Sequence, residues 1–544
     1  MKQLFSRYFL CLFFCSFAVT AFAQQHVYTP DNGNGTYTNP LMWGDWPDPD
    51  IIRVGDDFYF ISTSMHYVPG CPIAHSKDLV NWTMAGYAIN RYDEDPRYDM
   101  EGGTMYCRGS WANTIRYHNG KFYVGFCTPN WGKEKGHFSM CVANNIKGPW
   151  KRTIFPQYLY DPGLFFDDDG KVYVVHGQGS LYITELNSDA LSVKGKPKLI
   201  WDKSIPVPEG SSAPKGGYGM EGSHMYKING YYYITCPAGG TEGWQMCLRS
   251  KNIDGPYESK IIVQDESSYP PNGLHQGGMV QLKDGSWWFI IMQDRGPIGR
   301  VPNLVPVVWK DGWPMLGENG DGKGVVTYTK PNVGKIYPIQ VPATSDEFNK
   351  ATLGLQWQWN HNPDNSRWSL TERPGYLRLH GDYAPDLYHA RNSLTQRVQG
   401  SASSATTEME LKGMKDGDIA GLAVFQKPYV CIAVKQYGTT RYVVMLNDGN
   451  VIDSFKTKNN KIWFKAIATD QDFIAPFFYS QDGKQFTPFG NRLKMGLGFP
   501  WTANRFMLSC FNDLSRAKAG YADFNWFHFS GHDLKQKNTS AINN

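Results

Sequence analysis

Short aromatic and β-branched runs recur along the first half of the chain, each preceded by a polar or glycine-containing turn. The turns lie at Asp56-Asp57, Asn119-Gly120, Asp169-Gly170, Asn229-Gly230 and Asp284-Gly285. Asp-Gly and Asn-Gly between apolar runs are strong β-hairpin signals, because a type I′ turn needs positive φ at both central residues. The pattern therefore predicts five hairpins. Second turn-and-aromatic units follow three of them, at 76–82, 144–150 and 251–257, and suit the outer edges of blades.

The hairpins recur at intervals of roughly 50–65 residues, which is typical of the blades of a β-propeller. In each repeat, a polar or aromatic residue lies nine or ten positions before the second turn residue. These residues are Asp48, Trp111, Asp161, Glu221 and His275. If each hairpin begins a blade, we expect the five to open the innermost strands and to meet around one central channel.

The fold class that follows is all-β: a five-bladed β-propeller over residues 34–318, then a β-sandwich (jelly-roll) over 345–534. The 56 glycines, 33 prolines and 15% aromatic residues support it, and no long helical apolar period is present. A Gly- and Lys-rich linker is expected over 319–344, because the hairpin pattern ends there and longer alternating strands follow. The polar residues 535–544 are expected to form a disordered tail.

Residues 1–23 have the features of an export signal. Lys2 and Arg7 precede the apolar run 9–19, and Ala21-Phe22-Ala23 forms a cleavage site. An uncleaved membrane anchor is the alternative, but the run is short for a span. We expect an exported protein without membrane insertion, in the periplasm or otherwise secreted.

Charge and cysteine usage exclude two classes of function. With 54 basic and 50 acidic residues and no basic run, an ordinary surface is favoured over nucleic-acid binding. Eight of the ten cysteines follow the signal and form no CxxC pair, which argues against a zinc site. Buried thiols and disulfides both remain open.

Three of the five registered residues are carboxylic acids, and two carboxyl groups across a cleft are what glycosidic hydrolysis requires. Asp48 lies between two prolines, Asp161 precedes Pro162, and Glu221 precedes Gly222. A third carboxylate near a general acid would raise the pKa of that acid by repulsion. Acids at strand ends also make turn and capping bonds. Three of them in one register favour a site.

Other residues have a functional and a structural interpretation. Trp111 offers a flat face for a sugar ring, or is a core tryptophan. His275 lines the site or holds an ion through water, or is a core histidine. Arg300 holds a carboxylate bidentately, or lies on the surface.

At these residues the chain resembles glycoside hydrolase family 43, the β-xylosidase and α-L-arabinofuranosidase group whose members of this type carry a C-terminal concanavalin-like sandwich. The matching segments are 39–40 with 47–49, 76–79, 111–112, 160–170, 221–227, 299–300, 309–314, 373–379, 513–514 and 522–524. They occur in order over nearly the whole mature chain.

The resemblance implies a five-bladed propeller that hydrolyses with inversion. Asp48 would be the general base, Glu221 the general acid, and Asp161 the residue that orients the acid and tunes its pKa. Arg300 would hold the sugar and the base. His275 matches an axial histidine that is often associated with a calcium ion or a water cluster. No cofactor is required, and a structural calcium ion is the one that the family allows.

A few positions bear on the sugar pocket. Phe506 matches an aromatic residue through which the sandwich closes the pocket. Asn113 replaces the proline usual after Trp-Ala. Met65 and His66 stand where the most similar β-xylosidases carry aromatic and acidic residues, at positions that line the pocket.

The expected function is exo-acting removal of terminal α-L-arabinofuranosyl units, and also of β-D-xylosyl units, from plant cell-wall oligosaccharides derived from hemicellulose. A β-1,4-xylosidase is the alternative, and a non-catalytic carbohydrate-binding protein is the alternative from another class. An endo-acting arabinanase would need an open groove, against which the appended sandwich argues. The oligomeric state is left open.

Overall fold

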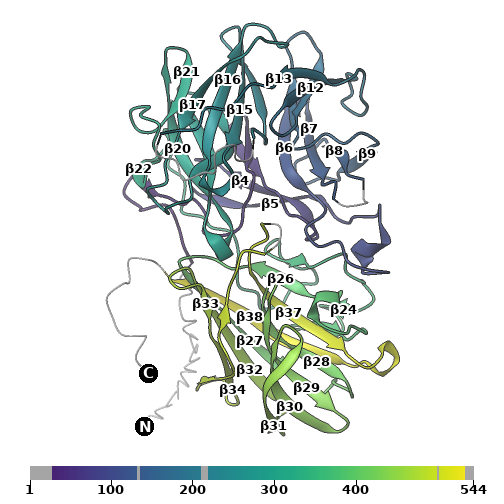
Figure 1. Cartoon of the computed structure of the whole chain (residues 1–544). Coiled ribbons are helices and arrows are strands. Elements are labelled where there is room, and N and C mark those ends of the chain that lie inside the picture. The colour runs from purple at the N-terminus through teal and green to yellow at the C-terminus, as the bar shows by residue number, and fades with distance from the viewer. Residues whose placement is uncertain (1–26, 132–134, 210–218, 499–500, 533–544) are drawn as a thin grey trace, which may run out of the picture.

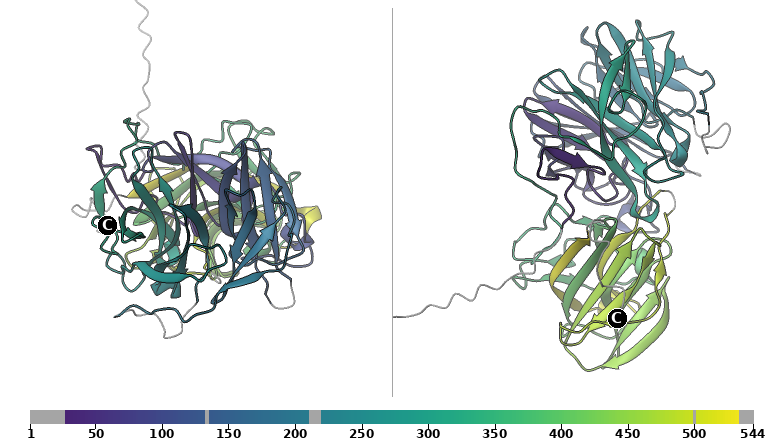
Figure 2. Two further views of the ribbon diagram at one scale, coloured as in Figure 1. Left: turned by 90° about the horizontal axis from the view of Figure 1, so that it is seen from above. Right: turned by 90° about the vertical axis from the view of Figure 1, so that its left-hand side faces the viewer.

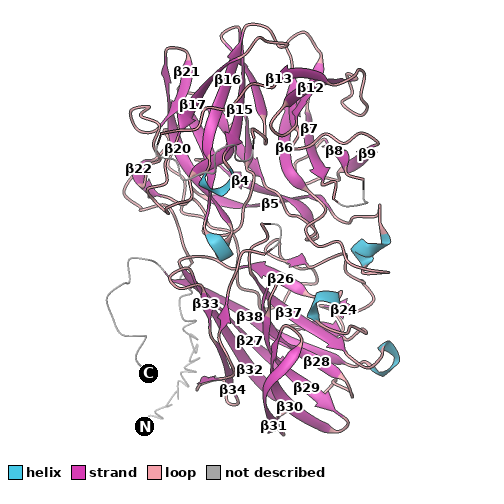
Figure 3. Ribbon diagram, in the orientation of Figure 1, coloured by secondary structure: helices cyan, strands magenta, loops and turns pink. Residues whose placement is uncertain are grey.

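The computed structural model describes residues 27–131, 135–209, 219–498 and 501–532, and two β-domains make up this part of the chain (Figure 1). Its helices are short 3-10 turns at Pro96–Asp99, Gly240–Glu242, Gly296–Ile298, Leu387–His389 and Arg516–Lys518 (Figure 3). The predicted signal and tail, 1–23 and 535–544, lie outside the described residues. No described helix has the length and apolar character needed to cross a membrane.

The first domain contains five antiparallel four-stranded sheets, each made of consecutive strands. The sheets are β2 (Asp50–Val54), β3 (Asp57–Ile61), β4 (Gly70–Ser76) and β5 (Trp82–Ile89); β6 (Trp111–His118), β7 (Lys121–Thr128), β8 (His137–Ala143) and β9 (Lys151–Phe155); β10 (Gly163–Phe166), β11 (Val172–His176), β12 (Leu181–Leu186) and β13 (Lys198–Trp201); β14 (His224–Ile228), β15 (Tyr231–Ala238), β16 (Trp244–Ser250) and β17 (Glu258–Val263); and β18 (Leu274–Gln281), β19 (Trp287–Asp294), β20 (Arg300–Lys310) and β21 (Trp313–Leu316). The predicted five-bladed propeller is confirmed.

The five predicted hairpins join the first and second strands of the five blades. One turn is displaced by a residue: Val54 pairs with Asp57, so the first turn is Gly55-Asp56, not Asp56-Asp57. Gly55 adopts φ 66°, which glycine reaches without the steric cost of a Cβ. The predicted outer units at 76–82, 144–150 and 251–257 lie between the third and fourth strands of blades 1, 2 and 4.

The innermost strands pack around the ring: β2 contacts β6 and β18, β10 contacts β6 and β14, and β18 contacts β15. The ring is held closed by β1 (Thr36–Thr38), which pairs with β22 (Thr327–Thr329). Asn39 adds three hydrogen bonds, to both backbone groups of Leu304 and to the carbonyl of Val325. The predicted linker, 319–344, thus contributes a strand that returns to the start of the propeller.

A buried carboxylate ties three blades together on the axis. Asp50, fully buried at the start of β2, accepts hydrogen bonds from Arg116 (2.6 Å), Thr114 and the amide of Ile115 on β6. His224 of β14 lies 3.5 Å away. Burial alone would raise the pKa of Asp50, but Arg116 and His224 hold it below its ordinary value. The buried Asp50 carboxylate therefore holds β2, β6 and β14 together two residues after Asp48.

The second domain is a sandwich of two seven-stranded sheets, which confirms the second half of the fold prediction. One sheet has the order β23 (Gln358–Trp359), β26 (Leu394–Arg397), β37 (Arg505–Asn512), β28 (Asp418–Phe425), β29 (Val430–Tyr437), β30 (Thr440–Asn447) and β31 (Asn450–Thr457). The other has the order β24 (Trp368–Ser369), β25 (Leu377–His380), β38 (Tyr521–His532), β27 (Ala402–Glu410), β32 (Lys461–Thr469), β34 (Phe477–Ser480) and β35 (Thr487–Pro488), and β33 (Ile474–Ala475) pairs with β36 (Leu493–Lys494).

The two domains pack end to end, as two perpendicular views show (Figure 2). Trp43, Ile298 and Val301 of the propeller belong to the same buried apolar cluster as the sandwich core. Val68 and Trp359 exchange backbone hydrogen bonds across the junction. A shared apolar core holds the domains in fixed relation, so the sandwich can contribute to a site on the propeller. The eight cysteines of the described chain are buried, and no disulfide joins them.

Candidate active site

The five residues in the repeat register line one pocket at the end of the propeller that faces the sandwich. Its volume is about 620 Å³, counting the space that is open at its mouth. The lining residues are Asp48, Trp111, Tyr160, Asp161, Gln178, Glu221, Pro237, Ala238, Gly240, Thr241, His275, Gln276, Met292, Asp294, Arg300 and Trp501. Residues that are far apart in sequence thus meet at one axial mouth, because each opens the innermost strand of its blade.

The backbone just before β2 and β10 directs two of the acids. Asp48 has φ 53° and Asp161 has φ 50°, in the left-handed region. Aspartate reaches this region more readily than most residues, yet holding it there costs about 1–3 kcal/mol. Packing around the pocket offsets that cost, and both carboxyl groups are about 95% buried.

Asp48 is held at both oxygens. Its Oδ1 accepts a hydrogen bond from Nη1 of Arg300 at 2.8 Å, and its Oδ2 accepts one from Oγ1 of Thr63 at 2.6 Å. Thr63 is fixed in turn, because its hydroxyl oxygen accepts the amide N–H of Ala112 at 2.7 Å. These contacts fix the orientation of the Asp48 carboxyl group in the pocket, as a residue that accepts a proton from a bound water requires.

Glu221 is placed to carry a proton. Burial raises the pKa of Glu221 to about 7, and the charge of Asp48 adds to the increase. Gln178 (2.5 Å) and Tyr160 (3.2 Å) both donate to Oε2 of Glu221 and oppose this increase. Because both donors contact Oε2, Oε1 is left to hold the proton.

Asp161 is coupled to this acid. Burial raises the pKa of Asp161 well above its ordinary value, and the charges of Glu221 and Asp48 raise it further. Two carboxyl groups that repel each other this strongly titrate as a pair. Repulsion between the two carboxylates therefore favours retention of a proton by the pair.

Arg300 is buried beside Asp48 and not on the surface, but it holds this carboxylate through one donor and not bidentately as expected. Its Nη1 contacts Asp48, and its backbone N–H donates to Oδ1 of Asp45 at 3.0 Å. Within the described chain, its Nε and Nη2 have no hydrogen-bond partner. These donors are available to hydroxyl groups of a ligand in the pocket, where an unpaired N–H is costly.

His275 faces a carboxylate that the sequence analysis did not identify. Its Nδ1 lies 3.0 Å from the carbonyl of Gly273, and its Nε2 lies 3.4 Å from Oδ2 of Asp294. Burial raises the pKa of Asp294, and the charges of Asp48 and Asp45 contribute. Asp294 ends β19 opposite Arg300, a position that the hairpin register alone does not single out.

The expected calcium ion remains a prediction. Calcium takes six to eight oxygen ligands. The described residues contain no group of three or more His, Cys, Asp or Glu side chains that could hold a metal ion. His275 and Asp294 are two such side chains, 3.4 Å apart, and the ion stays an expectation at this position.

The sandwich closes one side of the pocket through Trp501. The ring of Trp501 meets that of Trp111 edge to face, with centroids 6.1 Å apart. Phe506, the expected contact, does not line the pocket: it is fully buried in the sandwich core, where it packs on Phe529. The cause is strand register, since Phe506 lies within β37 and points inward, whereas Trp501 precedes that strand.

Two other expected pocket positions lie behind the lining. Met65 is buried in a cluster with Trp111 and is not exposed to the pocket. His66 lies in the domain junction, where its Nε2 is 3.1 Å from Oδ1 of Asn360. Asn113, at the position of the usual proline, donates to the carbonyl of Ser62. None of these three residues lines the pocket, and Met65 packs behind Trp111.

Comparisons with known proteins agree with this geometry. Residues 37–314 match the model of glycosyl hydrolases family 43, and residues 345–530 match the beta xylosidase C-terminal concanavalin A-like domain.

Relatives align over much of their length. The chain is 33% identical to a beta-xylosidase from Formosa agariphila, covering 92% of this chain and 91% of that protein. It is 37% identical to a non-reducing end alpha-L-arabinofuranosidase, BoGH43B, from Bacteroides ovatus, over 64% of this chain and 65% of the other. A solved structure described as a bifunctional GH43-CE from Bacteroides eggerthii superposes with a TM-score of 0.81 at 37% identity, covering 91% of this chain and 64% of that one. The chain belongs to glycosyl hydrolase family 43 and is a glycosidase of the xylosidase and arabinofuranosidase type.

Proposed function

We propose that this enzyme removes non-reducing terminal α-L-arabinofuranosyl units from hemicellulose-derived oligosaccharides by an inverting mechanism, and β-D-xylosyl units as a second activity. The observation that carries the proposal is one pocket lined by both Glu221, whose pKa is raised to about 7, and Asp48, which Arg300 and Thr63 hold at its two oxygens. The sandwich residue Trp501 closes one side of that pocket, which favours removal of a terminal sugar over cleavage within a chain.

The two acids have complementary roles. Glu221 transfers its proton to the glycosidic oxygen as the bond to the anomeric carbon breaks. Asp48 removes a proton from a water molecule as the water oxygen attacks that carbon from the opposite face. Asp48 and Glu221 come from blades 1 and 4 and line the same pocket. Inversion requires their carboxyl groups to lie about 6.5–9.5 Å apart, so that a water fits between base and sugar.

The free donors of Arg300 would bind sugar hydroxyl groups while its Nη1 holds Asp48. Asp161 and Glu221 repel each other when both are ionised, so the pair favours a state in which one of them holds a proton. After one turnover the proton lost by Glu221 has gone to the leaving alcohol and Asp48 has gained one. Exchange with solvent resets both groups.

A β-xylosidase main activity is the second candidate, because the relative from Formosa agariphila, aligned over nearly its whole length, is named a beta-xylosidase. The two activities differ in the ring that the pocket accepts and not in the acid and base. We also propose that the protein acts outside the cytoplasm, on the basis of the leader at 1–23.

The test is a panel of aryl α-L-arabinofuranoside and aryl β-D-xyloside, followed by arabinoxylan, xyloglucan and arabinan, with the released sugar identified. Arabinose release supports the first candidate and xylose release the second. Binding without release of any sugar would instead indicate a carbohydrate-binding protein. Proton NMR of the first-formed product tests inversion, and a retained anomer would contradict the roles given to Asp48 and water.

A further inference from the structure

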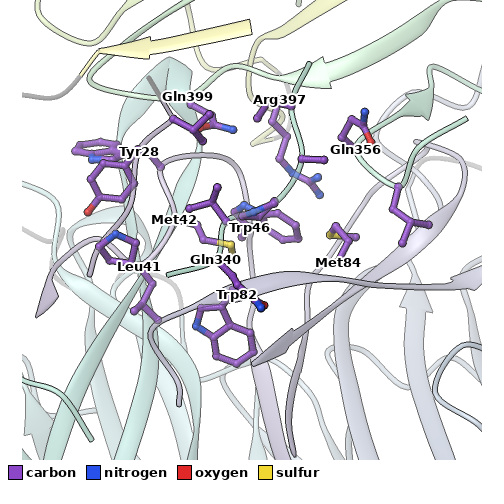
Figure 4. Close-up of a pocket in the computed structure, with 18 of the residues that line it drawn as sticks. Tyr28, Leu41, Met42, Trp46, Trp82, Met84, Gln340, Gln356, Arg397 and Gln399 are labelled. Atoms are coloured by element: carbon purple, nitrogen blue, oxygen red, sulfur yellow. The ribbon is translucent and has the colours of Figure 1, made fainter. Parts of the chain in front are cut away.

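A second pocket lies at the junction of the two domains (Figure 4). It has a volume of about 650 Å³, counting its open mouth, and shares no lining residue with the active site. Its walls come from the propeller segment 41–46, from β5, from the segment 340–344 and from the end of β26 with the residues that follow it. Two domains and the segment that connects them thus build one cavity.

A single charged side chain faces this cavity among the described residues that line it. Arg397 of β26 is 8% exposed, and its guanidinium lies 3.9 Å from the ring centroid of Trp46. Its Nε donates to the backbone carbonyl of Asp45 at 2.7 Å, and its Nη2 has no hydrogen-bond partner in the described chain. Among the residues that the structure describes, no carboxylate lines the pocket or bonds to Arg397, although the charge of Asp45 acts on it from outside the lining. A buried guanidinium with an unused donor favours a ligand with a negative charge.

The rest of the described lining is uncharged: half of the 20 lining residues are aliphatic, and most of the others carry aromatic rings or side-chain amides. Tyr28, Trp46 and Trp82 supply aromatic surface, and Gln340, Gln356 and Gln399 supply side-chain amides. Figure 4 shows Gln356 and Gln399 on either side of Arg397, with Trp46 beside its guanidinium. Aromatic surface next to amides suits a ring that has apolar faces and hydroxyl edges. One guanidinium among such groups suits a single carboxylate on that ring.

We propose that the junction pocket binds a hexuronic acid, a sugar that carries one carboxylate. The carboxylate would accept the unused N–H of Arg397, the sugar ring would lie against Tyr28 and the aliphatic lining, and the side-chain amides of Gln340 and Gln399 would bond hydroxyl groups. This binding is separate from hydrolysis and does not rest on the proposed activity. The junction would then be a second carbohydrate-binding site, specific for acidic sugars.

Isothermal titration of the full-length protein tests the proposal with four probes: glucuronate, glucuronic acid methyl ester, glucose and acetate. We expect glucuronate to bind with a Kd at least tenfold lower than that of each other probe. Equal binding of the ester or of glucose would overturn the role of the charge. Equal binding of acetate would overturn the sugar assignment, and absence of glucuronate binding would overturn the proposal as a whole.

Two variants locate the site. Arg397→Gln removes the guanidinium, and Gln399→Glu adds a carboxylate to the lining at a half-buried position that does not require the core to repack. We expect each to weaken glucuronate binding at least tenfold, with Gln281→Met, at the hairpin end of β18 and outside the lining of both pockets, as the matched control. If Arg397→Gln fails to fold, Gln399→Glu still tests whether glucuronate binds in this pocket. Unchanged glucuronate affinity in Gln399→Glu would contradict this location.

Discussion

Gln178 controls the pH at which the general acid loses its proton. Its Nε2 donates to Oε2 of Glu221 at 2.5 Å, and this hydrogen bond stabilises the ionised carboxylate. Gln178→Met keeps the side-chain length and removes the donor. Since the bond favours the charged form, the pKa of Glu221 rises when the bond is lost.

The size of the effect follows from the contact. A hydrogen bond to a charged group contributes about 1.5 kcal/mol at the lower end of its range, and Gln178 is exposed, so the lower end applies. One pKa unit corresponds to about 1.4 kcal/mol. We therefore expect the pKa of Glu221 to rise from about 7 by about one unit.

The assay is kcat/KM against pH with an unactivated disaccharide, because a poor leaving group depends on the proton of Glu221. The alkaline limb of the profile should move upward by about one pH unit in Gln178→Met. Gln281→Met serves as control and should leave the profile unchanged. An alkaline limb that stays in place or moves to lower pH would refute the assignment of Glu221 as the acid held by Gln178.

Three further predictions concern the supports of the site. Thr63→Val should lower kcat at least tenfold, because it removes a hydrogen bond to the Asp48 carboxylate that contributes about 1.5–3 kcal/mol. Thr63→Ser keeps the hydroxyl group and should restore most of the activity. Equal activity of the two variants would show that the hydroxyl does not orient the base. Trp501→Ala should raise KM more than it lowers kcat with little change in Tm, and a change in kcat alone would argue against a role in closing the pocket. His361 is fully buried, and burial lowers its pKa to about 3. Between about pH 6.5 and pH 3 the imidazole is therefore protonated in the unfolded chain but neutral in the folded protein. Stability should fall as the pH decreases from about 6.5 toward 3, by about 1.4 kcal/mol per unit from this group, and His361→Asn should flatten the slope of Tm against pH whereas the half-exposed His118→Gln should not.

The parts of the fold that were predicted correctly depend on local sequence. Each hairpin turn contains residues that tolerate positive φ, and each is followed by an apolar run, so the blades could be counted from the sequence. The repeat register then placed Asp48, Asp161 and Glu221 at one pocket, because equivalent positions in a propeller lie at the same end of the ring. The first turn was displaced, because Gly55 offered positive φ one residue earlier. The third and fifth turns are three-residue loops, in which Gly170 and Gly285 have positive φ but the preceding aspartates do not.

The parts that were missed depend on tertiary contacts. Gln178 follows the second strand of blade 3 and reaches Glu221 of blade 4, and no repeat position marks it. Asp294 is significant only because β19 pairs with β20 opposite Arg300. Trp501 and Phe506 are five residues apart, and which of them reaches the propeller is decided by where β37 begins and how the two domains pack.

The central claim is that Asp48 and Glu221 act as base and acid in one pocket. Steady-state turnover of an aryl arabinofuranoside and an aryl xyloside by Asp48→Asn and Glu221→Gln, both checked for native Tm, tests it most directly. We predict that each substitution lowers kcat/KM by several orders of magnitude on whichever substrate the unmodified enzyme hydrolyses. Near-full turnover by either folded variant would contradict the account.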